Sequence, residues 1–518
     1  MRKTSIALAL TTCFALAAPA FADDEPAKKE TKTETKTETS KSEKLTPKHV
    51  ETEGSVTVEG KKIDYKAVAG TIILDDKKGE GTASIFYAAY FKKLAEPTQR
   101  PVMFIYNGGP GSATVWLHMG AFGPKRVVTA DDQHTAPAPY GLVNNDYSLL
   151  DVSDLVFIDA PGAGFSTFAD KEKGPKEYFG VDPDAEAFAQ FIGKFMSKYG
   201  RWNSPKYLFG ESYGTTRSAV LANLLQSEKS IDLNGVILLS QVLNMAMLID
   251  FPEINPGVDL SYQLVLPTYA ATAWYHKKLS PELQSKTVQQ VAAEAENWAG
   301  NEYALALAKG DRLTGQERQE AVAKLSRYTG LSTQFVDNSN LRISLNLFRK
   351  ELLRDEKRSI GRLDARFKGF DTNLASDSPD YDPSEAAIRP PYTSTFNNYV
   401  RTELGYKNDL EYYILGGGIW SPWNWGTNNT YVDTSVALRN ALAKNPYLKI
   451  FVAMGYYDMA TPYYAADYTV HHISLDPSLL RNFSTGYYEA GHMMYIDEKS
   501  LVRMRADIGK FIQDSMAR

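Results

Sequence analysis

Cysteine is almost absent from this chain of 518 residues, which contains only Cys13. A single thiol cannot form an internal disulfide, so the fold must depend on a hydrophobic core, and the chain is long enough to bury a large one. An excess of one charge is also lacking, because 57 basic residues nearly balance 62 acidic residues. The net charge of −5 gives no reason to expect a nucleic-acid partner.

Long apolar runs are scarce as well. The N-terminal stretch, residues 6–18, is short for a membrane span. Arg2 and Lys3 precede it and Ala20-Phe21-Ala22 follows it, which is the pattern of a secretory signal with its cleavage site. We therefore expect residues 1–22 to be a signal peptide and the mature protein to be exported without cysteine, most simply to a bacterial periplasm. No other segment is predicted to span a membrane.

Residues 23–50 are of low complexity and contain Lys, Glu and Thr with almost nothing apolar. Such a segment cannot bury enough surface to offset the entropy of ordering, so we expect a disordered linker.

The rest of the chain alternates between strand and helix patterns. Short β-type runs separated by turns predict strands at residues 55–59, 63–69, 71–74 and 82–90. Continuous apolar runs predict strands that are buried on both faces at residues 101–106 and 155–158. Further strands are predicted at residues 207–209, 235–239, 448–454 and 483–488. Between them, helices are predicted from Asp182, as N-cap, to Tyr199 and at residues 215–226 and 500–517.

This alternation is interrupted between residues 243 and 392, where the sequence is mostly helical and charged. We expect an α/β core at residues 51–242 and 393–518 with a helical cap, residues 243–392, inserted into it. The cap's helices are predicted at residues 280–308, 315–328 and 341–357. An acidic loop with Asp377, Asp380 and Asp382 resembles a calcium loop only loosely, and a solvated loop is the preferred reading. No metal-ligand spacing or P-loop occurs, so we expect no metal and no cofactor.

The most informative motif is Gly210-Glu211-Ser212-Tyr213-Gly214, directly after an apolar strand and before a helix. Glycines on both sides allow a strained turn that projects the serine oxygen above the sheet edge, as in a nucleophile elbow. The motif predicts Ser212 as a nucleophile and, with its context, an α/β-hydrolase fold.

A serine nucleophile needs a base and an acid that orients the base. Of seven histidines, His492 follows a predicted strand at the sheet edge where a catalytic histidine is expected. Asp458 directly follows the strand at 448–454 and is the predicted acid, and Asp467, in the next helix, is its rival. The glycine-rich loop Asn107-Gly108-Gly109-Pro110-Gly111-Ser112 also follows a strand. Its amides, with that of Tyr213, are predicted to form an oxyanion hole.

These motifs, with Gly491-His492-Met493 and the segment 154–166, resemble the serine carboxypeptidase family of the carboxypeptidase Y and cathepsin A type. The resemblance runs from about Gly54 to the C-terminus and is weakest through the cap. It implies that Ser212, Asp458 and His492 form a catalytic triad and that Gly109 and Tyr213 are the oxyanion donors. It also implies that Asn107 and Glu211 bind the terminal carboxylate of a peptide substrate. Glu211 must then share a proton with that carboxylate, which favours acidic pH.

Two departures from the family leave the substrate range open. Ser112 stands where cysteine is frequent, and the run Gly214-Thr215-Thr216-Arg217 differs from the usual small residues. Trp420, Trp423 and Trp425 are read as aromatic packing, with a substrate pocket as the alternative. The expected activity is that of a carboxypeptidase acting through an acyl-enzyme. An esterase or acyltransferase on the same fold is the alternative, and a non-catalytic binding protein is less favoured. The sequence does not indicate the oligomeric state.

Overall fold

The computed structural model describes residues 44–248, 257–416, 423–427 and 430–517. The expected signal peptide, residues 1–22, and most of the expected linker lie outside the described residues. The end of the linker differs from the expectation, since strand β1 (His49–Val58) begins before residue 50. The main chain of Lys48 already bonds to Thr71 of the neighbouring strand, which draws this part of the chain into the sheet.

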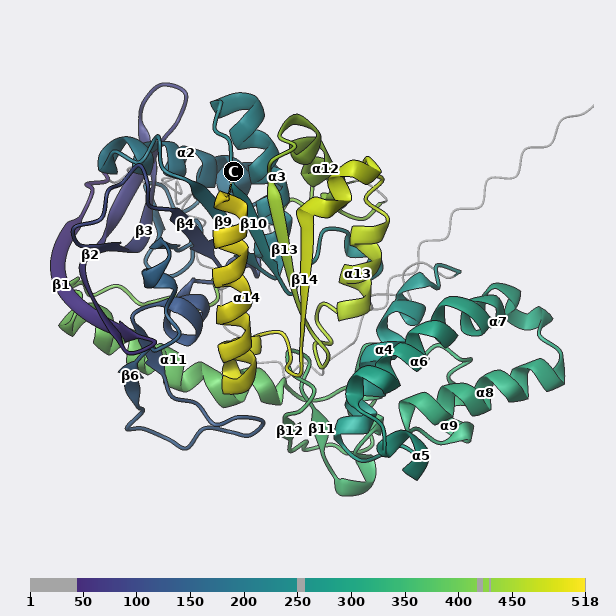
Figure 1. The fold of residues 1–518 in the computed structure, drawn as a ribbon. Coiled ribbons are helices and arrows are strands. Elements are labelled where there is room, and N and C mark those ends of the chain that lie inside the picture. The colour runs from purple at the N-terminus through teal and green to yellow at the C-terminus, as the bar shows by residue number, and fades with distance from the viewer. Residues whose placement is uncertain (1–43, 249–256, 417–422, 428–429, 518) are drawn as a thin grey trace, which may run out of the picture. The chain divides into compact units, whose positions relative to one another are not determined.

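The described residues are built around one large sheet (Figure 1). In spatial order its strands are β1, β2 (Lys61–Asp75), β3 (Gly81–Lys92), β7 (Asp154–Ile158), β4 (Val102–Tyr106), β9 (Lys206–Glu211), β10 (Gly235–Leu239), β13 (Lys449–Gly455) and β14 (Phe483–Tyr488). Strands β7, β4, β9, β10, β13 and β14 run parallel to one another, whereas β1, β2 and β3 form an antiparallel wing that joins β7. The short strand β8 (Thr167–Phe168) pairs with β3.

The apolar runs predicted the parallel strands correctly, and every residue of β4, β7 and β10 is buried. One prediction in the wing is wrong. The two strands expected at residues 63–69 and 71–74 are a single strand, β2, that continues through Gly70. Glycine is no break here because β1 and β3 pair with β2 on both sides of it.

Several helices lie between the strands in the sequence or follow the last strand, and they accompany this sheet. They are α1 (Gly174–Tyr178), α2 (Val181–Tyr199), α3 (Tyr213–Lys229), α12 (Ser435–Lys444), α13 (Tyr463–His471) and α14 (Glu498–Met516). Helix α14 packs against β13 and β14 and crosses in front of the strands in Figure 1. Helix α2 begins earlier than predicted, because the carbonyl of Gly180 already accepts from the Asp184 amide, so Gly180 rather than Asp182 is the N-cap.

A mostly helical region follows β10. Its elements are α4 (Leu260–Tyr275), α5 (Pro281–Gln284), α6 (Val288–Trp298), α7 (Ala304–Lys309), α8 (Gly315–Thr329), α9 (Thr333–Asn338), α10 (Leu345–Glu351), β11 (Ser359–Ile360), β12 (Lys368–Gly369) and α11 (Pro383–Thr402). The single helix expected at 280–308 is divided, because Thr287 and Gln290 form a capping box that starts α6. The helix expected at 341–357 is also shorter, and α11 runs past residue 392, where the cap was expected to end.

Outside the main sheet, β5 (Lys125–Val127) and β6 (Leu142–Asn144) form a small hairpin. Within the described residues, none of the helices has both the length and the apolar character that a membrane crossing requires.

Candidate active site

Ser212 lies at a sharp turn between strand β9 and helix α3. Its φ of 59° and ψ of −129° fall in a region that residues other than glycine rarely adopt. The turn is so tight that a Cβ on Gly210 would collide with the carbonyl of Gly214. The Ser212 amide donates to the carbonyl oxygen of Leu239, at the end of β10, at 2.9 Å. This is the geometry of a nucleophile elbow, with the half-buried serine at the carboxyl end of its strand.

Asp458 and His492 meet at the ends of the next strands. The His492 Nδ1 atom is 2.7 Å from Asp458 Oδ2, and both side chains are buried. The other Asp458 oxygen accepts from the amides of Ala460 and Thr461, and the Thr461 hydroxyl donates to Oδ2 at 2.6 Å. Because a carboxylate only accepts hydrogen bonds, Nδ1 carries the hydrogen and Nε2 keeps a lone pair. The imidazole is therefore oriented as a base.

The charge environment of His492 favours proton uptake. Burial lowers its pKa, but the electrostatic effect of Asp458, the hydrogen bond to Asp458 and the charge of Glu211 outweigh burial and raise the pKa above its ordinary value. The guanidinium of Arg362 opposes them more weakly. The imidazolium that forms when His492 accepts a proton is therefore stabilised in place.

Strand β10 connects the serine turn to the histidine loop. Its end accepts the Ser212 amide at Leu239, and the hydroxyl of the next residue, Ser240, donates to the His492 carbonyl oxygen at 2.6 Å. The Ser240 amide donates to Ala453 of β13, the strand that leads to Asp458. The structure thus brings Ser212, Asp458 and His492 to one edge of the sheet.

The rival acid, Asp467, lies elsewhere. It is in α13, where it accepts from the Tyr487 hydroxyl at 2.7 Å and is 3.4 Å from His471. No hydrogen bond between Asp467 and His492 occurs in the described part of the chain.

The glycine-rich loop after β4 packs directly on the serine turn. A Cβ on Gly108 would collide with the amide nitrogens of Tyr213 and Gly214, so only glycine allows this approach. Gly109 has a φ of 100°, which also favours glycine. Among the described residues, no protein acceptor takes the amide hydrogen of Gly109 or of Tyr213. Two unpaired donors next to a serine can stabilise a developing oxyanion.

Asn107 and Glu211 form a buried pair beside Ser212. The Asn107 side chain lies beside the carboxyl group of Glu211 and lowers its pKa. Its Oδ1 atom accepts from the Leu117 amide at 3.2 Å, so the NH₂ group is the part of this side chain that can act as a donor. The hydroxyl of Tyr495 donates to Glu211 Oε2 at 2.8 Å. All three residues of this polar cluster are at most 4% exposed.

Burial raises the pKa of Glu211 to about 7, although His492 and the hydrogen bonds from Tyr495 and Asn107 lower it in part. Asp458, which bears a like charge, raises it further. Glu211 is thus a carboxyl group that holds its proton in mildly acidic solution.

The sequence showed Arg217 only as a departure from the family pattern. In the structure, Arg217 binds the main chain of the glycine-rich loop. Its guanidinium is fully buried and pairs with Asp184 at 2.7 Å. It also donates to the Asn107 carbonyl oxygen at 2.8 Å. A charged residue inside the first turns of a helix after the elbow is the signal that points to such a buried pair, because a buried charge needs a partner.

A second missed feature is the strap, residues 362–366, which crosses the loops that carry Asp458 and His492. The His492 amide donates to the carbonyl oxygen of Leu363 at 2.6 Å, and the Met459 amide donates to that of Arg362 at 3.1 Å. In the other direction, the Ala365 amide donates to Tyr457 at 3.0 Å. Residues far apart in the sequence are thus held together by main-chain bonds.

The side chain of Asp364, in the strap, bonds to the histidine loop. Its Oδ2 atom accepts from the Gly491 amide at 3.2 Å, and Arg366 binds the same carboxylate through Nη2 at 2.7 Å and Nε at 3.0 Å. Asp131 also pairs with Arg366. No local pattern in the sequence indicates these contacts.

Of the three tryptophans considered as a possible substrate pocket, Trp423 and Trp425 are described by the structure. Trp420 lies outside the described residues. Trp423 is 7% exposed, and its ring centre is 5.3 Å from that of Tyr213 and 5.8 Å from that of Phe179. The ring of Trp425 is 6.1 Å from Tyr213. Trp423 therefore packs against Tyr213, the residue that follows Ser212, as the packing hypothesis expected.

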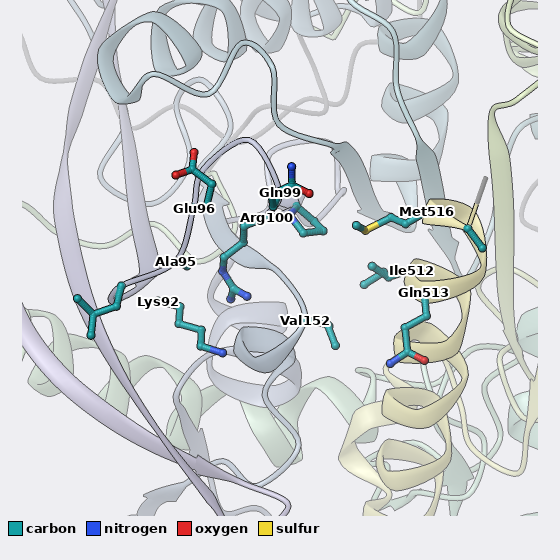
Figure 2. Close-up of a pocket in the computed structure, with 12 residues that line it drawn as sticks. Lys92, Ala95, Glu96, Gln99, Arg100, Val152, Ile512, Gln513 and Met516 are labelled. Carbon is teal, nitrogen blue, oxygen red and sulfur yellow. The ribbon is translucent and has the colours of Figure 1, made fainter.

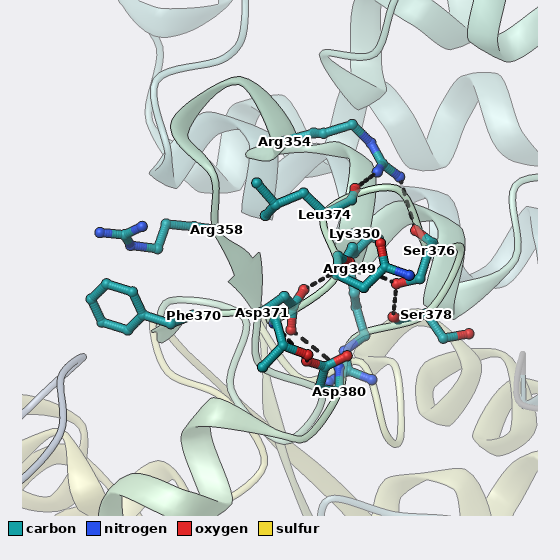
Figure 3. A network of polar contacts seen from close by, with 12 residues as sticks. Arg349, Lys350, Arg354, Arg358, Phe370, Asp371, Leu374, Ser376, Ser378 and Asp380 are labelled. Carbon is teal, nitrogen blue, oxygen red and sulfur yellow. Dashed lines mark hydrogen bonds and ion pairs between the residues drawn. The ribbon is translucent and has the colours of Figure 1, made fainter.

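The acidic loop contains carboxylates that bind protein donors (Figure 3). Lys350 pairs with Asp371 and donates to the Asn373 carbonyl, while Asp380 accepts from the amide and hydroxyl of Thr372. Asp382 caps α11 and accepts from the strap amides of residues 362 and 363. In the described ranges, no three acidic, histidine or cysteine side chains are grouped as metal ligands.

A cavity of about 600 Å³ lies near the start of β4, and Figure 2 shows the residues that line it. Arg100 lines it together with Lys92, Val152 and Ile512. The Arg100 guanidinium forms an ion pair with Asp154, with Nε 2.6 Å from Oδ1. This cavity is at the amino end of the parallel strands, opposite the edge that carries Ser212.

Comparison with known proteins adds independent information on this fold. Kex1(Δ)p, a prohormone-processing carboxypeptidase of Saccharomyces cerevisiae, has a similar structure with a TM-score of 0.54. The alignment covers 87% of this chain and 92% of the yeast chain at 15% sequence identity. The chain therefore has the α/β-hydrolase fold that its elbow predicted.

Curated relatives match over shorter stretches. Serine carboxypeptidase-like 33 of Arabidopsis thaliana is 27% identical over 228 residues, which is 42% of each chain. A carboxypeptidase Y homologue of Arthroderma benhamiae is 24% identical over 196 residues, 36% of each chain. The alignments thus span less than half the length of these relatives. The serine carboxypeptidase family model matches residues 59–501, and this chain therefore belongs to the serine carboxypeptidase family.

Proposed function

We propose that this protein is a serine-type carboxypeptidase that removes C-terminal residues from peptides through an acyl-enzyme. The observation that carries the proposal is the buried Glu211–Asn107 pair directly beside Ser212. A general esterase needs a nucleophile, a base and an oxyanion hole, but it has no need for a buried carboxyl group next to the nucleophile. An exopeptidase needs a group that recognises a free carboxylate.

In the proposed mechanism, the Ser212 Oγ atom attacks the last peptide carbonyl while His492 Nε2 accepts its proton. Asp458 holds the Nδ1–H of His492 and stabilises the imidazolium. The amides of Gly109 and Tyr213 donate to the oxyanion of the tetrahedral intermediate. His492 then gives the proton to the leaving amine, the C–N bond breaks, and water releases the acyl group by the same steps in reverse order.

Recognition of the substrate's terminal carboxylate depends on the proton of Glu211. Two ionised carboxylates in a buried site would repel each other, whereas a protonated Glu211 donates a hydrogen bond to its partner. With the pKa of Glu211 near 7, binding is favoured below that pH and weakens above it. The amide of Asn107 supplies a further donor.

The N-terminal pattern bears on where the protein acts, and the region between residues 243 and 392 bears on how its site is built. We infer export to the bacterial periplasm from the N-terminal pattern of residues 1–22. The inserted region, residues 243–392, acts as a cap, and this is supported by the strap that bonds to the loops of Asp458 and His492. The substrate is a peptide with a free C-terminus.

Phosphonylation by a fluorophosphonate tests the nucleophile. We expect one label per chain, mapped to Ser212 by peptide mass spectrometry, and we expect Ser212→Ala to lose both the label and several orders of magnitude in kcat/KM. Thermal unfolding of Ser212→Ala serves as the folding control. A protein that remains unlabelled while folded is a binding module, and a label elsewhere moves the nucleophile.

A further inference from the structure

Tyr495 stands out as a buried phenol that the proposed mechanism does not use. It lies in the short 3₁₀ helix η9 (Met494–Ile496), three residues after His492. Its hydroxyl donates to Glu211 Oε2 at 2.8 Å, and the residue is 2% exposed. Burial, followed by the charge of Glu211, raises its pKa well above the ordinary value. The phenol therefore keeps its hydrogen, and its role toward Glu211 is that of a donor.

The Tyr495 ring packs closely against Gly120, where a residue with a side chain would not fit. A Cβ on Gly120 would lie 2.8 Å from the Tyr495 ring and would collide with the Tyr392 hydroxyl. The absence of a side chain at Gly120 thus lets two tyrosines approach Glu211. Tyr392 is close enough to interact electrostatically with Glu211. Only Tyr495 of the two has a hydrogen bond to it among the described contacts.

A single donor on Oε2 makes the two oxygens of Glu211 unequal. An oxygen that accepts a hydrogen bond from a phenol is the better site for the negative charge and the poorer site for the carboxyl proton. The proton of the neutral acid is thus placed on Oε1, where a second carboxylate can accept it. Without the Tyr495 hydroxyl, Oε2 loses this donor, and the difference between the two oxygens that it creates is removed.

We propose that Tyr495 is a positioning residue for substrate recognition: it fixes which oxygen of Glu211 shares a proton with the peptide's terminal carboxylate and sets the pH at which that sharing ends. This inference rests on the proposed function and deepens it, because it assigns the orientation of Glu211 to one hydroxyl group. It predicts effects on binding of the free C-terminus and little effect on the chemical step.

The other groups that face Glu211 remain in place when Tyr495 is changed. They are His492 and Asp458 from the loops after β14 and β13, Tyr392 from α11, and the amide of Asn107. Since the Tyr495 hydrogen bond stabilises the ionised form, its removal raises the pKa of Glu211 further. The rise of KM with pH should then begin at a higher pH.

The test is the pH profile of KM and kcat for a peptide with a free C-terminus, measured from pH 4.5 to 9 with the full mature protein. For Tyr495→Phe we expect KM at pH 5 to rise at least about threefold, because orientation is lost, with kcat within about twofold of wild type. The pH at which KM begins to rise should move up by about one unit.

A stronger donor should act in the opposite direction. Tyr495 replaced by 3-fluorotyrosine keeps the shape of the ring and acidifies the phenol, so the pH at which KM rises should move down. This second variant also decides the matter if Tyr495→Phe fails to fold, as thermal unfolding will show. Tyr392→Phe is the matched control, and it should leave the KM profile where it is in wild type.

The outcomes separate this inference from the proposed function. If Glu211→Gln removes the pH dependence of KM but neither Tyr495 variant shifts it, Tyr495 has no positioning role and the carboxypeptidase proposal stands. If Tyr495→Phe lowers kcat and leaves KM unchanged, the inference is also wrong. If Glu211→Gln leaves the pH profile of KM unchanged, the carboxylate-recognition assignment itself fails.

Discussion

Glu211 illustrates how a single residue can relate catalysis to stability. Burial raises its pKa from an ordinary value of 4.5 to about 7. The folded protein therefore favours the neutral acid, and this stabilisation is complete below pH 4.5 and is lost as the pH rises through 7. A buried carboxyl group with a raised pKa thus destabilises the fold at neutral and alkaline pH, and such a cost is common at functional sites.

Glu211→Gln should therefore change how stability depends on pH. The amide does not titrate, so the variant should gain stability relative to wild type as the pH rises from 4.5 to 7, by up to about 3 kcal/mol. Urea unfolding at a series of pH values measures this difference. Exposed Glu172→Gln is the control, for which the two stability curves should remain parallel. Parallel curves for Glu211→Gln would mean that Glu211 is ionised in the folded protein.

At the residue scale, the sequence was most informative where a motif is local. The elbow around Ser212 and the loop around Gly109 are read from neighbouring residues, because glycine spacing dictates their backbone. Asp458 and His492 were predicted from their places after strands, and the structure brings their side chains together. Tyr495 was missed, because its partner is 284 positions away in the chain and no spacing connects the two.

At the scale of elements, the strap (residues 362–366) holds the loops that carry Asp458 and His492. Three main-chain bonds and the Asp364 carboxylate fix the segments around residues 457–459 and 491–492. The region between β10 and β13 is therefore bonded, through the strap, to the loops of Asp458 and His492. Small displacements of a base relative to its nucleophile are costly for catalysis.

Asp364→Asn tests this support. The change weakens the buried pair with Arg366 and the bond to the Gly491 amide, so we expect kcat/KM to fall about tenfold or more at temperatures where the variant is folded. The melting temperature should fall as well, since a buried ion pair is disturbed. Asp355→Asn, in an exposed pair with Lys278, should change neither. Full activity of a destabilised Asp364→Asn would show that the strap stabilises the fold without positioning His492.

Element types were predictable from the sequence, whereas boundaries and long-range contacts were not. Apolar runs identified β4, β7 and β10 because strands buried on both faces need no polar positions. The prediction of one helix at 280–308 was wrong, because a capping box at Thr287 starts a new helix within this range. The strap has no periodic pattern, and its structure depends on partners that lie about 90 to 130 positions away in the chain.

At the scale of the whole molecule, the fold needs no disulfide because its sheet is extensive. The antiparallel wing adds to the parallel strands, and Val56 and Val58 of β1 are buried in the core. The low-complexity segment before β1 offers no comparable surface. Stability should therefore depend on where the N-terminal segment is cut.

Removal of residues 1–43 should leave kcat/KM and the melting temperature nearly unchanged. Removal of residues 1–58 deletes β1 and uncovers the edge of β2, so we expect a loss of several kcal/mol and aggregation. Thermal unfolding and peptide hydrolysis of the two truncated forms make the comparison. A large effect of the shorter truncation would contradict the reading of this segment as a linker.

A carboxypeptidase recognises the free C-terminus of its substrate and releases the last residue, and we expect this protein to do both. The most direct measurement is a mass-spectrometric time course of one peptide in two forms, the free acid and the amide, at pH 5.5. We predict stepwise loss of single residues from the C-terminus of the free acid and at least about tenfold slower cleavage of the amide. Equal rates for the two forms, or cleavage at internal bonds, would contradict the account.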